Sequence, residues 1–241
     1  MMFLIFDVSG DHAHYRKYNS TSSPVTYSIP TRTATMGMVA AILGYDYNEY
    51  TEKLNSKNFQ CAIQIKNAIK KKFHGYNILQ GDNFRDNSIH SQVAYEFIES
   101  PKYRIYVTMN DETLDELRDR IIQKNYHYSP YLGLAFMHAN IEYVGYEDFY
   151  EVNNINSDLI PILTAINIEK NPIRDWDKNY SAHYVLDNMP IEIKTDNIGK
   201  IVNKHVTKYA EVLTEINSNL LVVNIEKYLK SDEYGYNITT L

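Results

Sequence analysis

The chain has 241 residues, enough to bury a hydrophobic core as one large domain or two small ones. Its 44% hydrophobic and 22% charged residues are typical of a soluble globular protein, and no stretch approaches the ~20 apolar residues that span a bilayer. The formal net charge of −6, taken alone, argues against a nucleic-acid binder.

The charge is unevenly divided along the chain. Residues 1–110 carry twelve Lys or Arg against nine Asp or Glu, whereas residues 111–241 carry twelve against twenty-one. The first part therefore offers positive charge to a polyanion, and the acidic second part limits where that polyanion can lie. A single cysteine, Cys61, excludes an internal disulfide and favours a reducing compartment. The opening apolar run is too short for a signal peptide and contains Asp7, so we expect a cytoplasmic protein.

In chain order, the first expected element is a buried strand over residues 3–8, ended by Gly10. A loop rich in ring and basic side chains follows. Apolar residues on one face then predict a short helix over residues 33–43, with Thr31 or Thr33 as its N-cap and Gly44 just past its end.

A second strand is expected over residues 59–69 and ends in a basic cluster. Residues 75–92 are polar and turn-rich, which is typical of a long loop or a projecting hairpin. A structureless loop of this length in a compact domain usually has a function or is disordered, and the sequence leaves both alternatives open.

Two β-runs, at residues 93–98 and 103–109, are joined by Glu-Ser-Pro-Lys, which indicates a hairpin. The segment 111–125 has leucine and isoleucine at helical spacing and predicts an amphipathic helix, capped by Asn110 or Asp111. Residues 134–146 complete the set as a strand.

The resulting order is strand, helix, strand, strand, helix, strand, which predicts an α+β protein with a ferredoxin-like domain, as in the RNA-recognition fold. We expect this domain to span residues 1–147. Residues 148–241 are acidic with short β-runs, and we expect them to form a smaller β-rich unit beside it.

The opening segment, residues 7–44, carries the candidate chemistry. Strand, charged loop and helix amino-terminus together build an anion-binding edge from backbone N–H groups and cations. Arg32 stands immediately before the helix, which favours a phosphate contact. Lys70, Lys71 and Lys72 are either further phosphate contacts or a solvated lysine run.

Other chemistries are less well supported by the residues. The sequence contains no Walker loop, dinucleotide fingerprint, HExxH motif or paired CxxC. His12 and His14 are spaced as a possible metal pair, or else are loop residues facing solvent or phosphate; we expect no metal and no cofactor. A metal-free ribonuclease would need a base and a cation, and the candidates are His12, His14, His74, Tyr15, Tyr27 and Lys72.

The opening segment resembles the amino-terminal signature of the CRISPR-associated RAMP proteins called Cas family five. The matching pieces occur in order, and they are Gly10, Ala13-His14-Tyr15-Arg16-Lys17, Ser23-Pro24, Tyr27, Pro30, Arg32-Thr33 and Gly37. A second piece, residues 129–141, is similar to the family's Pro-x-Leu-Gly segment. Among subtypes the sequence is most similar to the type I-B branch.

The resemblance implies an RNA-binding structural subunit of a Cascade-type surveillance complex in antiviral defence, capping the 5′ handle of the crRNA. It implies contacts with the repeated backbone subunit and the large subunit, with target DNA touched at most indirectly and no membrane. Residues 75–92 would then be the thumb that projects from the ferredoxin-like domain in this family. The RNA-binding residues expected on this basis are His14, Tyr15, Arg16, Lys17, Tyr27, Arg32, Thr33, Lys70, Lys71, Lys72, His74 and Arg85.

One branch of the family processes crRNA itself with a Tyr and an adjacent Lys-His pair. The only Lys-His pair here, Lys204-His205, lies outside the matching motifs. We therefore expect no enzymatic activity. The alternatives are a metal-independent endoribonuclease acting on CRISPR repeat RNA and a purely protein-binding scaffold.

Overall fold

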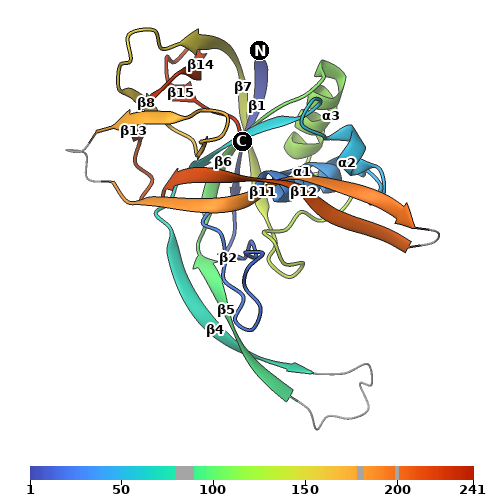
Figure 1. Cartoon of the computed structure of the whole chain (residues 1–241). Coiled ribbons are helices and arrows are strands. Elements are labelled where there is room, and N and C mark those ends of the chain that lie inside the picture. Colours follow the sequence, from blue (N-terminus) through green and yellow to red (C-terminus); the bar gives the residue numbers. More distant parts are fainter. Residues whose placement is uncertain (80–89, 178–181, 199–200) are drawn as a thin grey trace.

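The computed structural model describes residues 1–79, 90–177, 182–198 and 201–241, and this part of the chain is mostly β (Figure 1). The helices are α1 (Arg32–Leu43), α2 (Tyr50–Lys53) and α3 (Asp111–Ile122). The strands are β1 (Met2–Ser9), β2 (His12–Ala13), β3 (Gln60–Ile65), β4 (Lys70–Leu79), β5 (His90–Glu99), β6 (Lys102–Thr108), β7 (Asn140–Asn153), β8 (Ile160–Ile162), β9 (Ile166–Asn167), β10 (Ile173–Trp176), β11 (Tyr184–Ile198), β12 (Ile201–Glu215), β13 (Leu221–Ile225), β14 (Lys227–Ser231) and β15 (Asn237–Ile238).

A six-stranded antiparallel sheet in the order β15-β14-β7-β1-β6-β3 forms the centre of the molecule. β1 is apolar without alternation because both of its faces are covered. Leu4 and Phe6 belong to the main core with α1 and α3, whereas Phe3 and Ile5 pack on the other face with Phe149. The expected strand at residues 3–8 is therefore confirmed.

The two longer helices each connect two strands of this sheet. α1 joins β1 to β3, and α3 joins β6 to β7. The Thr31 side chain accepts a hydrogen bond from the backbone N–H of Ala34 at 3.1 Å, and Gly44 ends α1 with φ of 79°. In α3, the Asn110 side chain accepts from Thr113 N–H at 2.9 Å. None of the helices in the described part is long and apolar enough to cross a membrane.

One expected hairpin is wrong. β5 and β6 follow one another closely in sequence, but β5 pairs with β2 and β4, whereas β6 pairs with β1 and β3. Ser100, with φ of 46°, turns the chain from one sheet into the other, and its N–H donates to the Asp11 carbonyl at 2.8 Å. The turn residues identified in the sequence are real, but they connect two sheets.

β4 and β5 form an antiparallel hairpin that extends away from the central sheet, as the lower part of Figure 1 shows. Residues 75–92 were expected to form a long loop or a projecting hairpin, and their described residues, 75–79 and 90–92, lie in the two strands of this hairpin. Residues 80–89 lie outside the described part, and the predicted site residue Arg85 lies among them.

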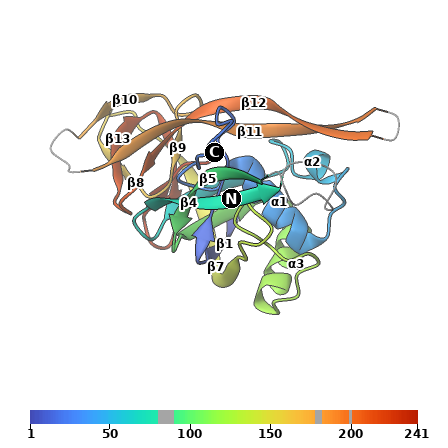
Figure 2. The same ribbon diagram turned by 90° about the horizontal axis from the view of Figure 1, so that it is seen from below.

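A second long hairpin, β11–β12, crosses the molecule, and α1 lies between it and α3 (Figures 1 and 2). The expected division between residues 147 and 148 lies inside β7, and β14 and β15 extend the same central sheet. The division into two units stays a prediction.

Candidate functional site

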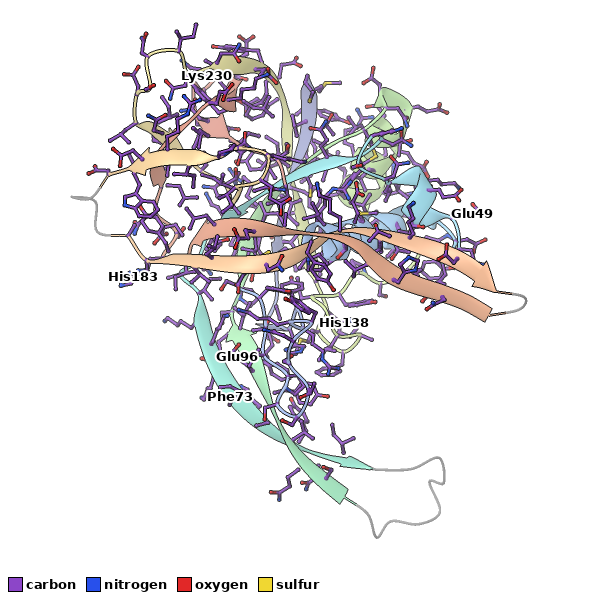
Figure 3. All side chains as sticks on the ribbon, in the orientation of Figure 1. Glu49, Phe73, Glu96, His138, His183 and Lys230 are labelled. Atoms are coloured by element: carbon purple, nitrogen blue, oxygen red, sulfur yellow. The ribbon has the colours of Figure 1, made fainter. Side chains whose placement is uncertain are left out.

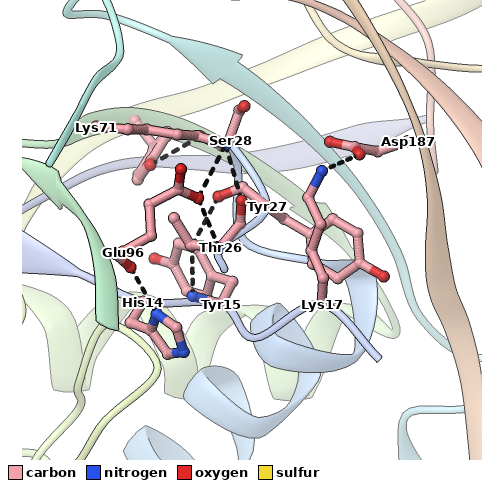
Figure 4. A network of polar contacts seen from close by, with 10 residues as sticks. His14, Tyr15, Lys17, Thr26, Tyr27, Ser28, Lys71, Glu96 and Asp187 are labelled. Atoms are coloured by element: carbon pink, nitrogen blue, oxygen red, sulfur yellow. Dashed lines mark hydrogen bonds and ion pairs between the residues drawn. The ribbon is translucent and has the colours of Figure 1, made fainter. Parts of the chain in front are cut away.

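Residues of the opening segment meet the base of the β4–β5 hairpin in a polar network (Figure 4). The backbone N–H of Thr26 donates to Glu96 Oε2 at 2.9 Å, and Lys71 Nζ donates to the Thr26 carbonyl at 2.8 Å. Tyr15 N–H donates to the Thr26 hydroxyl at 2.8 Å. Burial lowers the pKa of Lys71, and the Glu96 carboxylate opposes that change. Lys71 therefore connects the β4–β5 hairpin to the opening segment through Thr26.

His14 is buried at the same place. Its Nδ1 lies 2.8 Å from the Glu96 carbonyl oxygen, which can only accept, so Nδ1 carries the proton. Burial lowers the pKa of His14, which outweighs the opposing effect of this hydrogen bond, and the imidazole is neutral at pH 7. Its Nε2 has no hydrogen-bond partner among the described residues.

Lys17 and Tyr27 contact β11. Lys17 Nζ forms an ion pair with the buried Asp187 carboxylate, and the Tyr27 hydroxyl donates to the Asn188 carbonyl at 2.8 Å. The Lys17 ammonium also lies 5.5 Å from the centre of the Tyr27 ring. Burial raises the pKa of Tyr27 to about 12.

Arg32 is the clearest correction to the sequence interpretation. Its side chain is only 2% exposed, and its guanidinium donates to the carbonyls of Ile191 at 2.7 Å, Phe59 at 2.8 Å and Leu54 at 3.4 Å, and to Met36 Sδ at 3.1 Å. Burial lowers its pKa. A guanidinium whose donors are already used inside the protein is not placed for the phosphate contact that the sequence predicted. Together Arg32, Lys17 and Tyr27 hold β11, and we call these three side chains the β11 anchor.

The remaining predicted residues of the opening segment differ in exposure. Tyr15 is buried, its hydroxyl has no partner within the described ranges, and burial raises its pKa. Thr33 is half-buried, with its hydroxyl 3.0 Å from that of Thr31. Arg16 is exposed and donates to the Ser20 carbonyl at 3.0 Å. Of these three residues, Arg16 is the one that is exposed at the surface.

β4 carries the other predicted cations. Alternate residues of a strand point to opposite faces, so Lys70, Lys72 and His74 share one face and Lys71 lies on the other. Lys70 and Lys72 are exposed, and Lys72 forms an ion pair with Glu99 at 3.6 Å. His74 is half-buried, with its ring stacked 5.3 Å from that of Phe97.

Beside this face lies a cavity of about 290 Å³ that the sequence interpretation did not identify. Figure 3 labels His138, one of its lining residues, together with Phe73 and Glu96 of the hairpin. The lining residues are Asp11, His12, His74, Tyr76, Phe97, Phe136, Met137 and His138. The period-two alternation of β4 would have placed Tyr76 beside His74, but Phe136 and His138 come from a distant loop. Within the described ranges, no cluster of three His, Cys, Asp or Glu side chains is arranged to hold a metal ion.

The comparisons with known proteins agree with the sequence resemblance. A family model described as CRISPR-associated protein (Cas_Cas5) matches residues 3–132, more than half of the chain. The chain belongs to this Cas5 family. The predicted membership of Cas family five is thereby confirmed, and the type I-B assignment stays a prediction. No curated protein matches the chain.

Two solved structures are similar to this Cas5-family chain over most of its length. A CRISPR protein from Archaeoglobus fulgidus is 14% identical, with a TM-score of 0.57, and 97% of each chain is covered. A chain of a CRISPR RNA-guided surveillance complex is 11% identical, with a TM-score of 0.51, and 91% of each chain is covered. At these identities the likeness concerns the fold.

Proposed function

We propose that this Cas5-family chain is an RNA-binding structural subunit of a type I CRISPR surveillance (Cascade) complex and caps the 5′ handle of the crRNA. Family membership and the fold shared with a chain of an RNA-guided surveillance complex support this role. On this proposal the repeated backbone subunit and the large subunit are its protein partners, and target DNA is contacted at most indirectly.

The observation that carries the proposal is the face of β4 that bears Lys70, Lys72 and His74. These side chains stand on a hairpin that extends from the protein body, and both lysines are exposed. Positively charged side chains at alternate positions of a strand, with aromatic rings beside them, can bind the phosphates and the unpaired bases of single-stranded RNA. In contrast, the β11 anchor and Lys71 are occupied by contacts within the protein.

The central sheet supports a ferredoxin-like assignment. Four of its strands lie side by side in the order β7-β1-β6-β3. α1 connects β1 to β3 and α3 connects β6 to β7, which is the arrangement that two consecutive strand-helix-strand units produce. We include this assignment in the proposal, since RNA-recognition domains use the same arrangement.

A double variant tests the proposed RNA contact. Lys70→Ala with Lys72→Ala should weaken binding of a labelled single-stranded RNA and lower the salt slope of log Kd by roughly 0.7 for each phosphate that the variant no longer neutralises. Titrations at several salt concentrations measure both quantities. Lys227→Ala is the matched control, because Lys227 is also exposed on a strand and also pairs with a glutamate, Glu151 at 3.0 Å. Unchanged affinity and slope in the double variant would contradict the proposal.

The rival function is a metal-independent endoribonuclease, and one observation favours it. The rings of His12 and His74 lie 5.4 Å apart beside an open cavity, and two imidazoles can serve as base and acid. Incubation of the protein with labelled repeat RNA in EDTA separates the two functions. We expect intact RNA; a discrete product that disappears in His74→Ala would establish the rival instead.

A further inference from the structure

A groove runs between the β4–β5 hairpin and the loop at residues 131–138. The cavity of about 290 Å³ described above adjoins a second one of about 250 Å³, and the two share Tyr76, Phe97 and Phe136. The second cavity also involves Ile78, Tyr95 and Leu134, with Asn77 at its edge. We call this continuous depression the hairpin groove.

Aromatic rings form the hairpin side of the groove. Phe97 is fully buried and forms its floor, with Tyr76 at 5.7 Å and His74 at 5.3 Å between ring centres. His12 meets His74 edge-on at 5.4 Å. Tyr76 remains 41% exposed, so one of its sides is open to a ligand.

The opposite wall is a tight loop that brings Phe136 to the groove. Leu132 N–H donates to the Met137 carbonyl at 2.8 Å and closes the loop. Gly133 has φ of 98°, and a Cβ there would lie 1.8 Å from the His14 carbonyl oxygen. Glycine therefore allows the loop to approach the hairpin base closely. Phe136 is 63% exposed, so its ring is open to a ligand.

Polar groups also lie in and beside the groove. His74 Nε2 is inaccessible to water and has no hydrogen-bond partner in the described part of the chain. Lys70 and Lys72 lie on the same face of β4, next to the rings. An apolar peptide side chain would contact the rings alone, whereas a nucleotide would also bring a phosphate to the cations.

We propose that the hairpin groove holds one unpaired nucleobase of the bound RNA, in contact with the rings of Tyr76 and Phe136, while Lys72 takes a neighbouring phosphate. The base is a flat heterocycle that can stack on aromatic side chains. This inference rests on the proposed RNA-binding function and adds the residues that hold a base.

Ring removal on exposed positions provides the test. Tyr76→Leu and Phe136→Leu keep apolar bulk and remove the aromatic face. The probe is a short single-stranded RNA with 2-aminopurine at successive positions, because stacking quenches its fluorescence. Since one stacked base contributes about 1–3 kcal/mol, each variant should raise Kd by roughly 5- to 140-fold and reduce quenching at one position of the RNA.

Phe73→Leu is the matched control. Phe73 is also an exposed aromatic residue of β4, at 54%, but it lies on the opposite face from Tyr76. The Phe73→Leu variant should retain the wild-type Kd for RNA and the wild-type quenching of 2-aminopurine fluorescence. Circular dichroism and a thermal unfolding curve confirm that each variant folds.

The outcomes separate the inference from the proposed function. If Tyr76→Leu and Phe136→Leu bind RNA as tightly as the wild type while the Lys70/Lys72 double variant binds it weakly, the inference about the groove is wrong. The proposed RNA-binding function then still stands. Loss of co-purifying backbone subunit at unchanged RNA affinity overturns the inference about the groove in favour of a protein-docking groove. Absence of any RNA binding by the wild-type protein overturns both.

Discussion

The β11–β12 and β4–β5 hairpins both extend across or away from the central sheet, but their polar neighbours are arranged differently (Figure 1). The first half of β11 is held by side chains of the opening segment: Lys17 pairs with Asp187, Tyr27 donates to Asn188 and Arg32 donates to Ile191. β4 is attached mainly at its base, where Lys71 donates to Thr26, and the rest of its exposed face carries unburied cations and rings.

The difference shows that residue type alone does not identify a ligand contact. A basic side chain is available to RNA only if its donors are not held in buried contacts with carbonyls or carboxylates of the protein. The β11 anchor uses its donors to fix a hairpin, whereas Lys70 and Lys72 are exposed and the ion pair of Lys72 with Glu99 lies at the surface. Three predictions test this contrast, and the first should have the largest effect.

Arg32→Met should destabilise the protein by more than about 3 kcal/mol, because three buried carbonyls lose their donor and each unsatisfied group costs about 1–3 kcal/mol. Methionine keeps much of the apolar volume, so the loss reports mainly on hydrogen bonding. Urea unfolding measures the change. RNA affinity per folded molecule should remain that of the wild type.

Arg16→Met is the matched control for Arg32→Met. Arg16 is exposed and makes one hydrogen bond, to the Ser20 carbonyl, so its removal should change stability by about 0.5–1 kcal/mol or less. If Arg32→Met were as stable as the wild type and bound RNA weakly, the phosphate contact predicted from sequence would be restored and the β11 anchor would lose its main member.

Lys17→Met should cost about 1–3 kcal/mol, because it leaves the buried Asp187 carboxylate without its cation. Asp187→Asn and the double variant complete a double-mutant cycle, whose coupling energy measures the ion pair itself. The exposed pair of Lys227 and Glu151 supplies the comparison and should couple by less than about 1 kcal/mol. Equal coupling in the two pairs would mean that Lys17 is not part of a structural anchor.

Local sequence signals predicted local structure well. Thr31 and Gly44 mark the two ends of α1 because an N-cap hydroxyl and a left-handed glycine act within a few residues. The strand β1 and the helix α3 were predicted for the same reason: their apolar patterns are continuous along the chain.

The role of Arg32 could not be read locally, because one of its acceptors, the Ile191 carbonyl, is 159 residues away in the sequence. The pairing of β5 also depends on a long-range partner, and Pro101 beside a turn residue predicts a turn without saying which strands it joins. The groove residue Phe136 falls in the strand expected over residues 134–146, but that strand begins only at Asn140 and Phe136 lies in the loop before it. It reaches the hairpin because Gly133 lets the loop approach His14.

The base of the β4–β5 hairpin should respond to pH through His14, with the smallest of the three effects. Burial lowers the pKa of His14 below its ordinary value of 6.5, so the folded protein holds the imidazole neutral while the unfolded chain takes up a proton. Stability is therefore complete above the unfolded pKa and is lost as the pH falls below it, by at most about 1.4 kcal/mol per pH unit.

Urea unfolding of the wild type and of His14→Gln, at several values between about pH 5 and pH 8, measures the slope. The variant should lose stability at every pH but show a shallower decline toward acid. Parallel curves for the two proteins would show that the His14 contact with Glu96 does not hold the hairpin base in a pH-dependent way.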